Sequence, residues 1–340
     1  MADGNAVKAR SRAPSFRPVV LDLDENGDLL DPDTQRPVPA VAVAGFLANQ
    51  LRVPDTVSDI VVFVHGWQNS RTTAKTRGNQ FFAMLESTYE ARRDGYSAIG
   101  LWSGHYIIVR WPSMSNPFLR GYRRIRDRAH AMTTSGRAAD VLAQVLGYLN
   151  IRRRLPGSPP TLRNATGQYL HCVGHSFGGR FLVEAVQAAA DSRPTVLGWN
   201  RSNPRYPHTL DTLLVFQMAA SSNVFTGRFD RILYDAPING PIVLTRSRAD
   251  RATGLWHRLA EGTPGIGHVG AAEPAQHICT IPLRNPATAY HHHELDKRIV
   301  NIDATWRYRR GRIWNPAGAH SDIWYPESAH LLLSLADLAR

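Results

Sequence analysis

Cysteine and lysine are both scarce in this chain. Its two cysteines, Cys172 and Cys279, are too few for a disulfide framework or a cysteine-based metal site. Cys172 lies inside an apolar run, which predicts a small buried core residue. Lysine occurs only at Lys8, Lys75 and Lys297, so arginine carries nearly all of the basic charge behind the formal net charge of +12. No recognition motif accompanies this charge, and we expect no nucleic-acid partner.

Long apolar runs are also missing. The longest, from Val41 to Ala48, is far shorter than the roughly 18 residues that a membrane span needs. Residues 1–18 are small, polar and basic and contain no signal-peptide core, so residues 1–14 are predicted to form a flexible basic tail. With 43% hydrophobic and 20% charged residues, positions 15–340 are expected to form one globular domain. These features favour a soluble, cytoplasmic protein without stable membrane insertion.

Two patterns invite a metal-binding interpretation, and both have simpler explanations. The segment from Asp22 to Asp28 matches the opening of a calcium loop, but position twelve is Asp33, and an Asn-Gly turn between strands explains the same residues. The run from His291 to Glu294 holds three consecutive histidines, which cannot all face one ion on a regular element. We therefore predict no metal and no other cofactor. The arginine-rich run from Arg120 to Arg128 is interpreted as a solvated helix face.

Apolar segments that suit buried strands alternate with amphipathic segments along most of the chain. This alternation predicts an α/β fold with a mostly parallel central sheet and helices on both faces. Lid segments are expected near 113–134 and 254–288. Strands are expected at 19–23, 60–64, 106–109, 169–173, 213–217, 242–245 and 299–304, and helices at 40–52, 73–93, 180–190 and 328–340, with a long helical stretch after Pro112.

The strongest chemical signal is Gly174-His175-Ser176-Phe177-Gly178-Gly179, which follows an apolar strand and precedes a helix. This context is that of a nucleophile elbow, in which a sharp turn exposes the serine hydroxyl above the sheet. Gly174 and Gly178, two residues before and after Ser176, let the chain bend without a clash. The amides at the start of the helix favour negative charge beside the serine. Ser176 is therefore the predicted nucleophile.

A second motif, His65-Gly66-Trp67, directly follows the apolar run 60–64. With V-F-V-H-G-W and G-H-S-F-G-G together, the sequence resembles the α/β-hydrolase superfamily, in particular its bacterial esterase/lipase-like serine hydrolases, from about Val19 to the end. The resemblance implies an α/β-hydrolase fold. It also implies an oxyanion hole formed by the backbone amides of Trp67 and Phe177, with His65 in a structural role.

The order of catalytic residues in that superfamily is serine, then acid, then histidine, which directs the search for the other two. The acid should follow the seventh strand, and Asp250 lies in the loop after residues 242–245. The base should lie between the last strand and the last helix, where His320 is found. The alternatives fit less well, because they lie before or within a strand or inside the terminal helix: Asp230, Asp235, Asp303 and His330.

We therefore expect a serine hydrolase that cleaves a small-molecule carboxylic ester through an acyl-serine intermediate, with a Ser176–Asp250–His320 triad. The preference for esters comes from the resemblance alone, and a thioesterase, amidase or peptidase would share the same triad. The alternative from another class is a non-catalytic protein of the same fold that binds a ligand or a partner. The sequence leaves acyl chain length and oligomeric state open.

Overall fold

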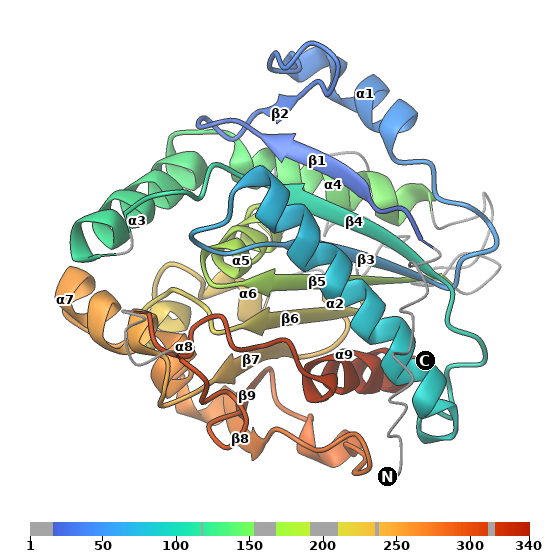
Figure 1. Cartoon of the computed structure of the whole chain (residues 1–340), viewed down its shortest axis with the longest axis vertical. Helices are drawn as coiled ribbons and strands as arrows, with labels where there is room; N and C mark the ends of the chain where they lie inside the picture. Colours follow the sequence, from blue (N-terminus) through green and yellow to red (C-terminus); the bar gives the residue numbers. More distant parts are fainter. Residues whose placement is uncertain (1–15, 117, 153–167, 191–209, 235–237, 312–316) are drawn as a thin grey trace, which may run out of the picture.

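A twisted central sheet dominates the computed structural model, which describes residues 16–116, 118–152, 168–190, 210–234, 238–311 and 317–340 (Figure 1). In this described part nine strands form one sheet, in the order β2-β1-β4-β3-β5-β6-β7-β9-β8. All neighbours pair in parallel except β1 and β2, which are antiparallel. The strands are β1 Val19–Leu23, β2 Leu29–Leu30, β3 Asp59–Val64, β4 Gly104–Arg110, β5 Tyr169–His175, β6 Thr212–Phe216, β7 Ile242–Arg246, β8 Ile278–Pro282 and β9 Ile299–Asp303.

The predicted mostly parallel sheet is confirmed, and all seven expected strands are present within a few residues of their predicted ends. Two strands escaped the prediction. Strand β2 has only two residues, and it pairs with β1 across the turn formed by Asn26 and Gly27, where Gly27 has a φ of 83°. Strand β8 lies inside the segment 254–288 and forms the sheet edge beside β9. Its residues are only partly buried, so they lack the apolar run that marks the other strands.

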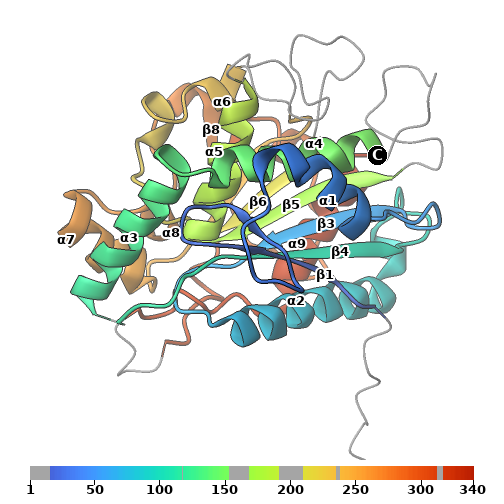
Figure 2. The same ribbon diagram turned by 90° about the horizontal axis from the view of Figure 1, so that it is seen from above.

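Helices cover both faces of the sheet, as predicted. Figure 2 shows α2 on one side of the sheet and α4 and α5 on the other. Helices α2 and α9 pack against each other, and so do α4 and α5. The α-helices of the described residues are α1 Val43–Gln50, α2 Arg71–Ala91, α3 Leu119–Thr134, α4 Ala138–Arg152, α5 Phe177–Ala190, α6 Arg231–Tyr234, α7 His257–Glu261, α8 Ile266–Val269 and α9 Pro326–Leu338.

The predicted long helical stretch after Pro112 is two helices, α3 and α4. The break between them lies against the β1–β2 turn, since Arg137 donates a backbone hydrogen bond of 2.7 Å to the carbonyl of Asn26. A Cβ added at Gly136 would lie 2.4 Å from that same carbonyl oxygen. The close approach of the turn therefore requires glycine at this point and ends the continuous helix.

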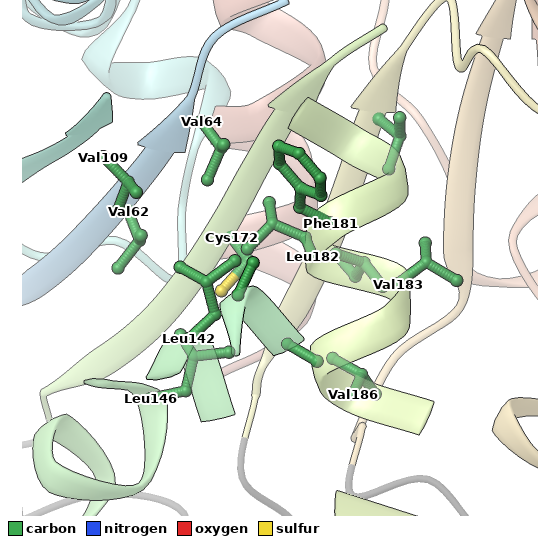
Figure 3. Packing of buried hydrophobic residues seen from close by; sticks show 14 of the residues in the cluster. Val62, Val64, Val109, Leu142, Leu146, Cys172, Phe181, Leu182, Val183 and Val186 are labelled. Carbon is green, nitrogen blue, oxygen red and sulfur yellow. The ribbon is translucent and has the colours of Figure 1, made fainter. Parts of the chain in front are cut away.

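The core lies in two layers, because successive side chains of each strand point to opposite faces of the sheet. Ile60, Val62 and Val64 of β3 belong to the cluster under α4 and α5, whereas Val61 and Phe63 belong to the cluster under α2 and α9. Figure 3 shows the first layer, in which side chains of α4 and α5 meet those of the central strands around a fully buried cysteine, as predicted: Leu142, Leu146, Cys172, Phe181, Leu182 and Val186. Each such side chain contributes about 1.5–3 kcal/mol by leaving water.

Candidate active site

Ser176 lies in a sharp turn between β5 and α5, at the carboxyl end of the sheet. Strand β5 ends at His175, Ser176 has a φ of 57°, and α5 begins at Phe177. A positive φ is unfavourable for a residue with a side chain, and such strain persists only where surrounding contacts hold it. Here the Ser176 amide donates a hydrogen bond of 2.9 Å to the carbonyl of Phe216 in β6.

Two glycines, one in the turn at Ser176 and one in the loop after β3, let these two segments pack closely together. A Cβ added at Gly178 would lie 2.4 Å from the carbonyl oxygens of Val64 and His65. A Cβ added at Gly66 would lie 2.8 Å from Ser176 Cβ. The loop that follows β3 is therefore in direct contact with the turn after β5, and a larger residue at either glycine would push the two apart.

The three residues predicted as a triad lie in one hydrogen-bonded row. His320 Nε2 is 2.7 Å from Ser176 Oγ, and His320 Nδ1 is 2.8 Å from Asp250 Oδ2. All three residues are buried, with exposed fractions of 0% for Ser176, 0% for Asp250 and 3% for His320. A carboxylate beside Nδ1 places the proton on that nitrogen and leaves Nε2 free to accept the serine proton.

The loop that carries Asp250 is joined directly to the loop that carries His320. Asp250 pairs with Gly318 in an isolated β-bridge, and Ala319 donates a hydrogen bond of 3.0 Å to the carbonyl of Ala249. The second carboxylate oxygen of Asp250 accepts a hydrogen bond of 3.0 Å from the amide of Thr253. Acid and base therefore keep their separation through backbone contacts as well as through their own hydrogen bond.

Two further side chains, those of His175 and Gln217, bind the backbone of the loop that carries His320. His175 Nε2 lies 2.7 Å from the carbonyl oxygen of His320, and Gln217 Nε2 donates a hydrogen bond of 3.2 Å to the carbonyl of Ala319. Burial lowers the pKa of His175 well below its ordinary value, so the ring is neutral and its Nε2–H donates to His320. The sequence placed His175 near the site but gave no partner for it. Gln217 carried no signal beyond its position directly after β6.

His65 fixes the loop after β3, in keeping with its predicted structural role. Trp111 donates to His65 twice, from its backbone amide to Nε2 at 3.2 Å and from its indole nitrogen to the backbone carbonyl at 2.7 Å. Since Nε2 accepts, the proton is on Nδ1, which lies 2.9 Å from the carbonyl oxygen of Gly66. Burial lowers the pKa of His65 to about 4, which keeps the ring neutral.

Trp67 follows Gly66 in the loop that contacts the turn at Ser176, and Phe177 directly follows that serine. Among the hydrogen bonds of the described residues, none uses the backbone amide of either residue. Phe177 is the first residue of α5, where backbone amides have no partner within the helix. The next amide along the loop, that of Gln68, is occupied by the carbonyl of Ser113 at 3.0 Å.

Tyr122 of α3 connects the two predicted oxyanion-hole residues to α7. Tyr122 of α3 lies with its ring centre 5.6 Å from that of Phe177 and 5.4 Å from that of Trp67. Its hydroxyl is 2.8 Å from Nδ1 of His257, the first residue of α7. Helices α3 and α7 lie side by side at the carboxyl ends of the strands (Figure 1). Ser176 itself has no exposed surface. A π-helix, Ala252–Trp256, leads from the Asp250 loop into α7.

Three of the four rejected residues lie in the described part of the chain, and none of them joins the row at Ser176. Asp303 at the end of β9 accepts a hydrogen bond of 2.7 Å from Arg246, and Asp230 is exposed at the start of α6. Asp235 lies outside the described residues. His330 is buried in α9, where its Nδ1 is 2.8 Å from the hydroxyl of Tyr96.

The structure also places the histidine run and the arginine-rich run noted in the sequence. The segment His292–Glu294 is a short 3₁₀ helix, and no group of three or more histidine, cysteine or acidic side chains in the described ranges is arranged to hold a metal ion. Of the α3 arginines, Arg120 and Arg124 are exposed, whereas Arg126 binds Asp127 and a carbonyl of α7. Within the same described ranges, no helix is both long enough and apolar enough to cross a membrane.

The parallel strand order, the strand–turn–helix at Ser176 and the placement of an acid after β7 and a histidine after β9 define an α/β-hydrolase fold. No protein-family model and no curated protein sequence matches the chain. Among solved structures, it is similar to TT1662 from Thermus thermophilus, at 13% identity and a TM-score of 0.37, over 85% of this chain and 91% of that one.

Two further similarities are weaker. A cutinase-like protein from Cryptococcus sp. has 12% identity and a TM-score of 0.29, over 83% of this chain and 94% of that one. Phospholipase PlaB from Legionella pneumophila has 15% identity and a TM-score of 0.26, over 60% of this chain and 43% of that one. Identities this low leave activity and substrate to be argued from the site itself.

Proposed function

We propose that the chain is a serine hydrolase that cleaves carboxylic esters through an acyl-serine intermediate. The observation that carries the proposal is the row from Ser176 Oγ to His320 Nε2 and from His320 Nδ1 to Asp250, at 2.7 and 2.8 Å in a buried setting. A serine hydroxyl is a weak nucleophile until a neighbouring base takes its proton. This row supplies the base and a carboxylate that orients it.

In the proposed reaction, His320 takes the Ser176 proton as Oγ attacks the ester carbonyl carbon. The tetrahedral intermediate then collapses, the bond to the alcohol oxygen breaks, and His320 returns the proton to that leaving group. A water molecule, activated by the same imidazole, attacks the acyl-serine and releases the acid. Asp250 stabilises the imidazolium that forms in each half of the cycle.

The carbonyl oxygen gains negative charge in both tetrahedral intermediates, and the free amides of Trp67 and Phe177 are the proposed donors to it. The contact between Gly66 and Ser176 keeps the first amide beside the nucleophile. The start of α5 adds the favourable end of a helix dipole at the second. Preorganised donors of this kind typically contribute on the order of 10²–10³ in rate each.

The choice of esters over thioesters, amides or peptides rests on the resemblance noted in the sequence. The non-catalytic alternative would be favoured by a missing or misplaced triad member, and no observation in the described residues favours it.

A small alkyl fluorophosphonate and a panel of p-nitrophenyl esters of increasing chain length test the proposal. Wild type should be labelled at Ser176 and should hydrolyse at least part of the panel. Ser176→Ala should fold normally, resist labelling and lose on the order of 10⁴–10⁶ in kcat. An Asp230→Asn variant, changed at an exposed residue, is the matched control and should retain activity. Full activity in a folded Ser176→Ala variant would refute the proposal.

A further inference from the structure

A cavity of about 430 Å³ lies between α3, α5 and α7, next to the candidate active site. Its charged and imidazole-bearing lining consists of Arg126, Asp127, His130, Arg180, Arg228 and Glu261. The mechanism described above uses none of these residues.

The cavity lies one helical turn from the nucleophile. Arg180 follows Ser176 by four residues on α5, an axial rise of about 6 Å, and its amide donates to the Ser176 carbonyl at 3.3 Å. Ser221, which also lines the cavity, lies 3.4 Å from His257 Nε2, and His257 Nδ1 lies 2.8 Å from the hydroxyl of Tyr122. Because the Arg180 and Ser176 backbones are in direct contact, a substrate of modest length is long enough to reach both the cavity and the nucleophile.

Positive charge is concentrated in the buried part of the cavity. The side chain of Arg180 is 9% exposed, and it shares a single carboxylate, Glu184, with Arg228. Arg180 Nε has no hydrogen-bond partner among the described residues, and its distance to Glu184 is 3.8 Å. His130 accepts a hydrogen bond of 2.9 Å from Arg228 and one of 3.5 Å from Arg180. Because an imidazole that accepts a hydrogen bond is neutral, His130 adds no negative charge to balance the two guanidinium groups.

The acidic residues of the lining lie in a different environment. Asp127 and Glu261 are exposed at the rim, and Asp127 already pairs with Arg126. Water screens exposed charges far more than buried ones, so the floor of the cavity determines its potential. Burial lowers the pKa of Arg228, although Glu184 lies beside it.

We propose that this cavity binds an anionic group, a carboxylate or a phosphate, on the ester that Ser176 cleaves. Arg180 and Arg228 are its main ligands and Arg126 is a third. The inference rests on the proposed function and adds the substrate class to it. Guanidinium groups suit this task because their planar donors match two oxygens of a carboxylate or phosphate at once. The exposed carboxylates at the rim repel an anionic group only weakly, because water screens them, so Arg180 and Arg228 determine the preference for anions.

The test compares p-nitrophenyl esters whose acyl chains end in a carboxylate, a phosphate or a methyl ester, at several chain lengths. Wild type should prefer a charged chain over the methyl-capped chain of equal length in kcat/KM. Arg228→Gln should reduce kcat/KM on the charged ester by about 10- to 100-fold and leave the methyl-capped ester unchanged. Arg124→Gln removes the same charge from an exposed position on α3 and is the matched control.

Thermal melts of each variant report on folding. If Arg228→Gln folds poorly, Arg126→Gln replaces it in the same comparison of charged and methyl-capped esters. A preference that is lost in either variant and kept in Arg124→Gln supports the inference. Equal wild-type rates on charged and methyl-capped esters, or a preference that survives both substitutions, would overturn the inference and leave the proposed function standing. No hydrolysis of any ester would overturn the proposed function, and this inference with it.

Discussion

Removing the imidazole of His175 should separate positioning of the catalytic base from catalysis itself. His175 contacts neither a substrate nor the serine hydroxyl, yet its Nε2–H donates to the backbone carbonyl of His320 at 2.7 Å. In His175→Leu that carbonyl is left buried without this donor, which costs about 1–3 kcal/mol of folding free energy. The loop is then free to relieve the cost by moving His320 away from Ser176.

A shift of about 1 Å in a catalytic group typically costs on the order of 10² in rate, so kcat should fall by about 10- to 100-fold in His175→Leu. His175→Gln retains a side-chain donor and should recover part of the loss. The matched control is His330→Gln, another buried histidine, which lies in α9 and pairs with Tyr96 rather than with the His320 loop. It should lower the melting temperature with little change in kcat.

The assay measures p-nitrophenyl ester hydrolysis, the rate of fluorophosphonate labelling and a thermal melt on all three variants. Wild-type kcat and labelling rate in a folded His175→Leu variant would refute the positioning role. A loss of rate in His330→Gln equal to that in His175→Leu would also refute it, because the effect would then follow from stability alone.

Three further predictions concern the triad, the oxyanion loop and acid stability. Asp250→Asn should reduce kcat by about 10²–10⁴, measured by ester hydrolysis, because the imidazole loses its orienting carboxylate, whereas exposed Asp230→Asn should keep wild-type kcat. Gly66→Ala should reduce kcat by at least about 10-fold, because its Cβ would lie 2.8 Å from Ser176 Cβ; unchanged kinetics would contradict the loop contact. His65 has its pKa lowered to about 4 by burial, so below its ordinary value of 6.5 the unfolded chain binds a proton that the folded chain does not. The free energy of unfolding should therefore fall by about 3 kcal/mol between pH 6.5 and pH 4, and His65→Gln should lose that part of the slope in pH-dependent denaturant titrations.

The sheet and the candidate triad could be predicted because each depends on a pattern that the chain displays locally. Runs such as Ile60–Val64 are apolar on both faces, and they mark strands buried inside a parallel sheet. The resemblance to the α/β-hydrolase superfamily implies an acid and a histidine in the loops after two of these strands, and the structure brings residues 144 positions apart in sequence to hydrogen-bonding distance.

The support and the cover of the site could not be predicted, because they depend on contacts between loops. Nothing in the sequence near Gln217 signals that its amide reaches Ala319. Likewise, the hydrogen bond between Tyr122 and His257 joins helices that are far apart in the chain. Segment 254–288 is predicted to contribute a lid, and its strand β8 escapes prediction because an edge strand is only half buried.

The complete burial of Ser176 bears on how chemical probes of this protein should be chosen. A reagent must reach a hydroxyl with no exposed surface, so its bulk would govern its labelling rate more than its intrinsic reactivity does. Large reporter groups attached close to the phosphorus atom would be excluded. Compact reagents, with the reporter on a slender linker or added after reaction, are the ones suited to detecting this serine among others in a mixture.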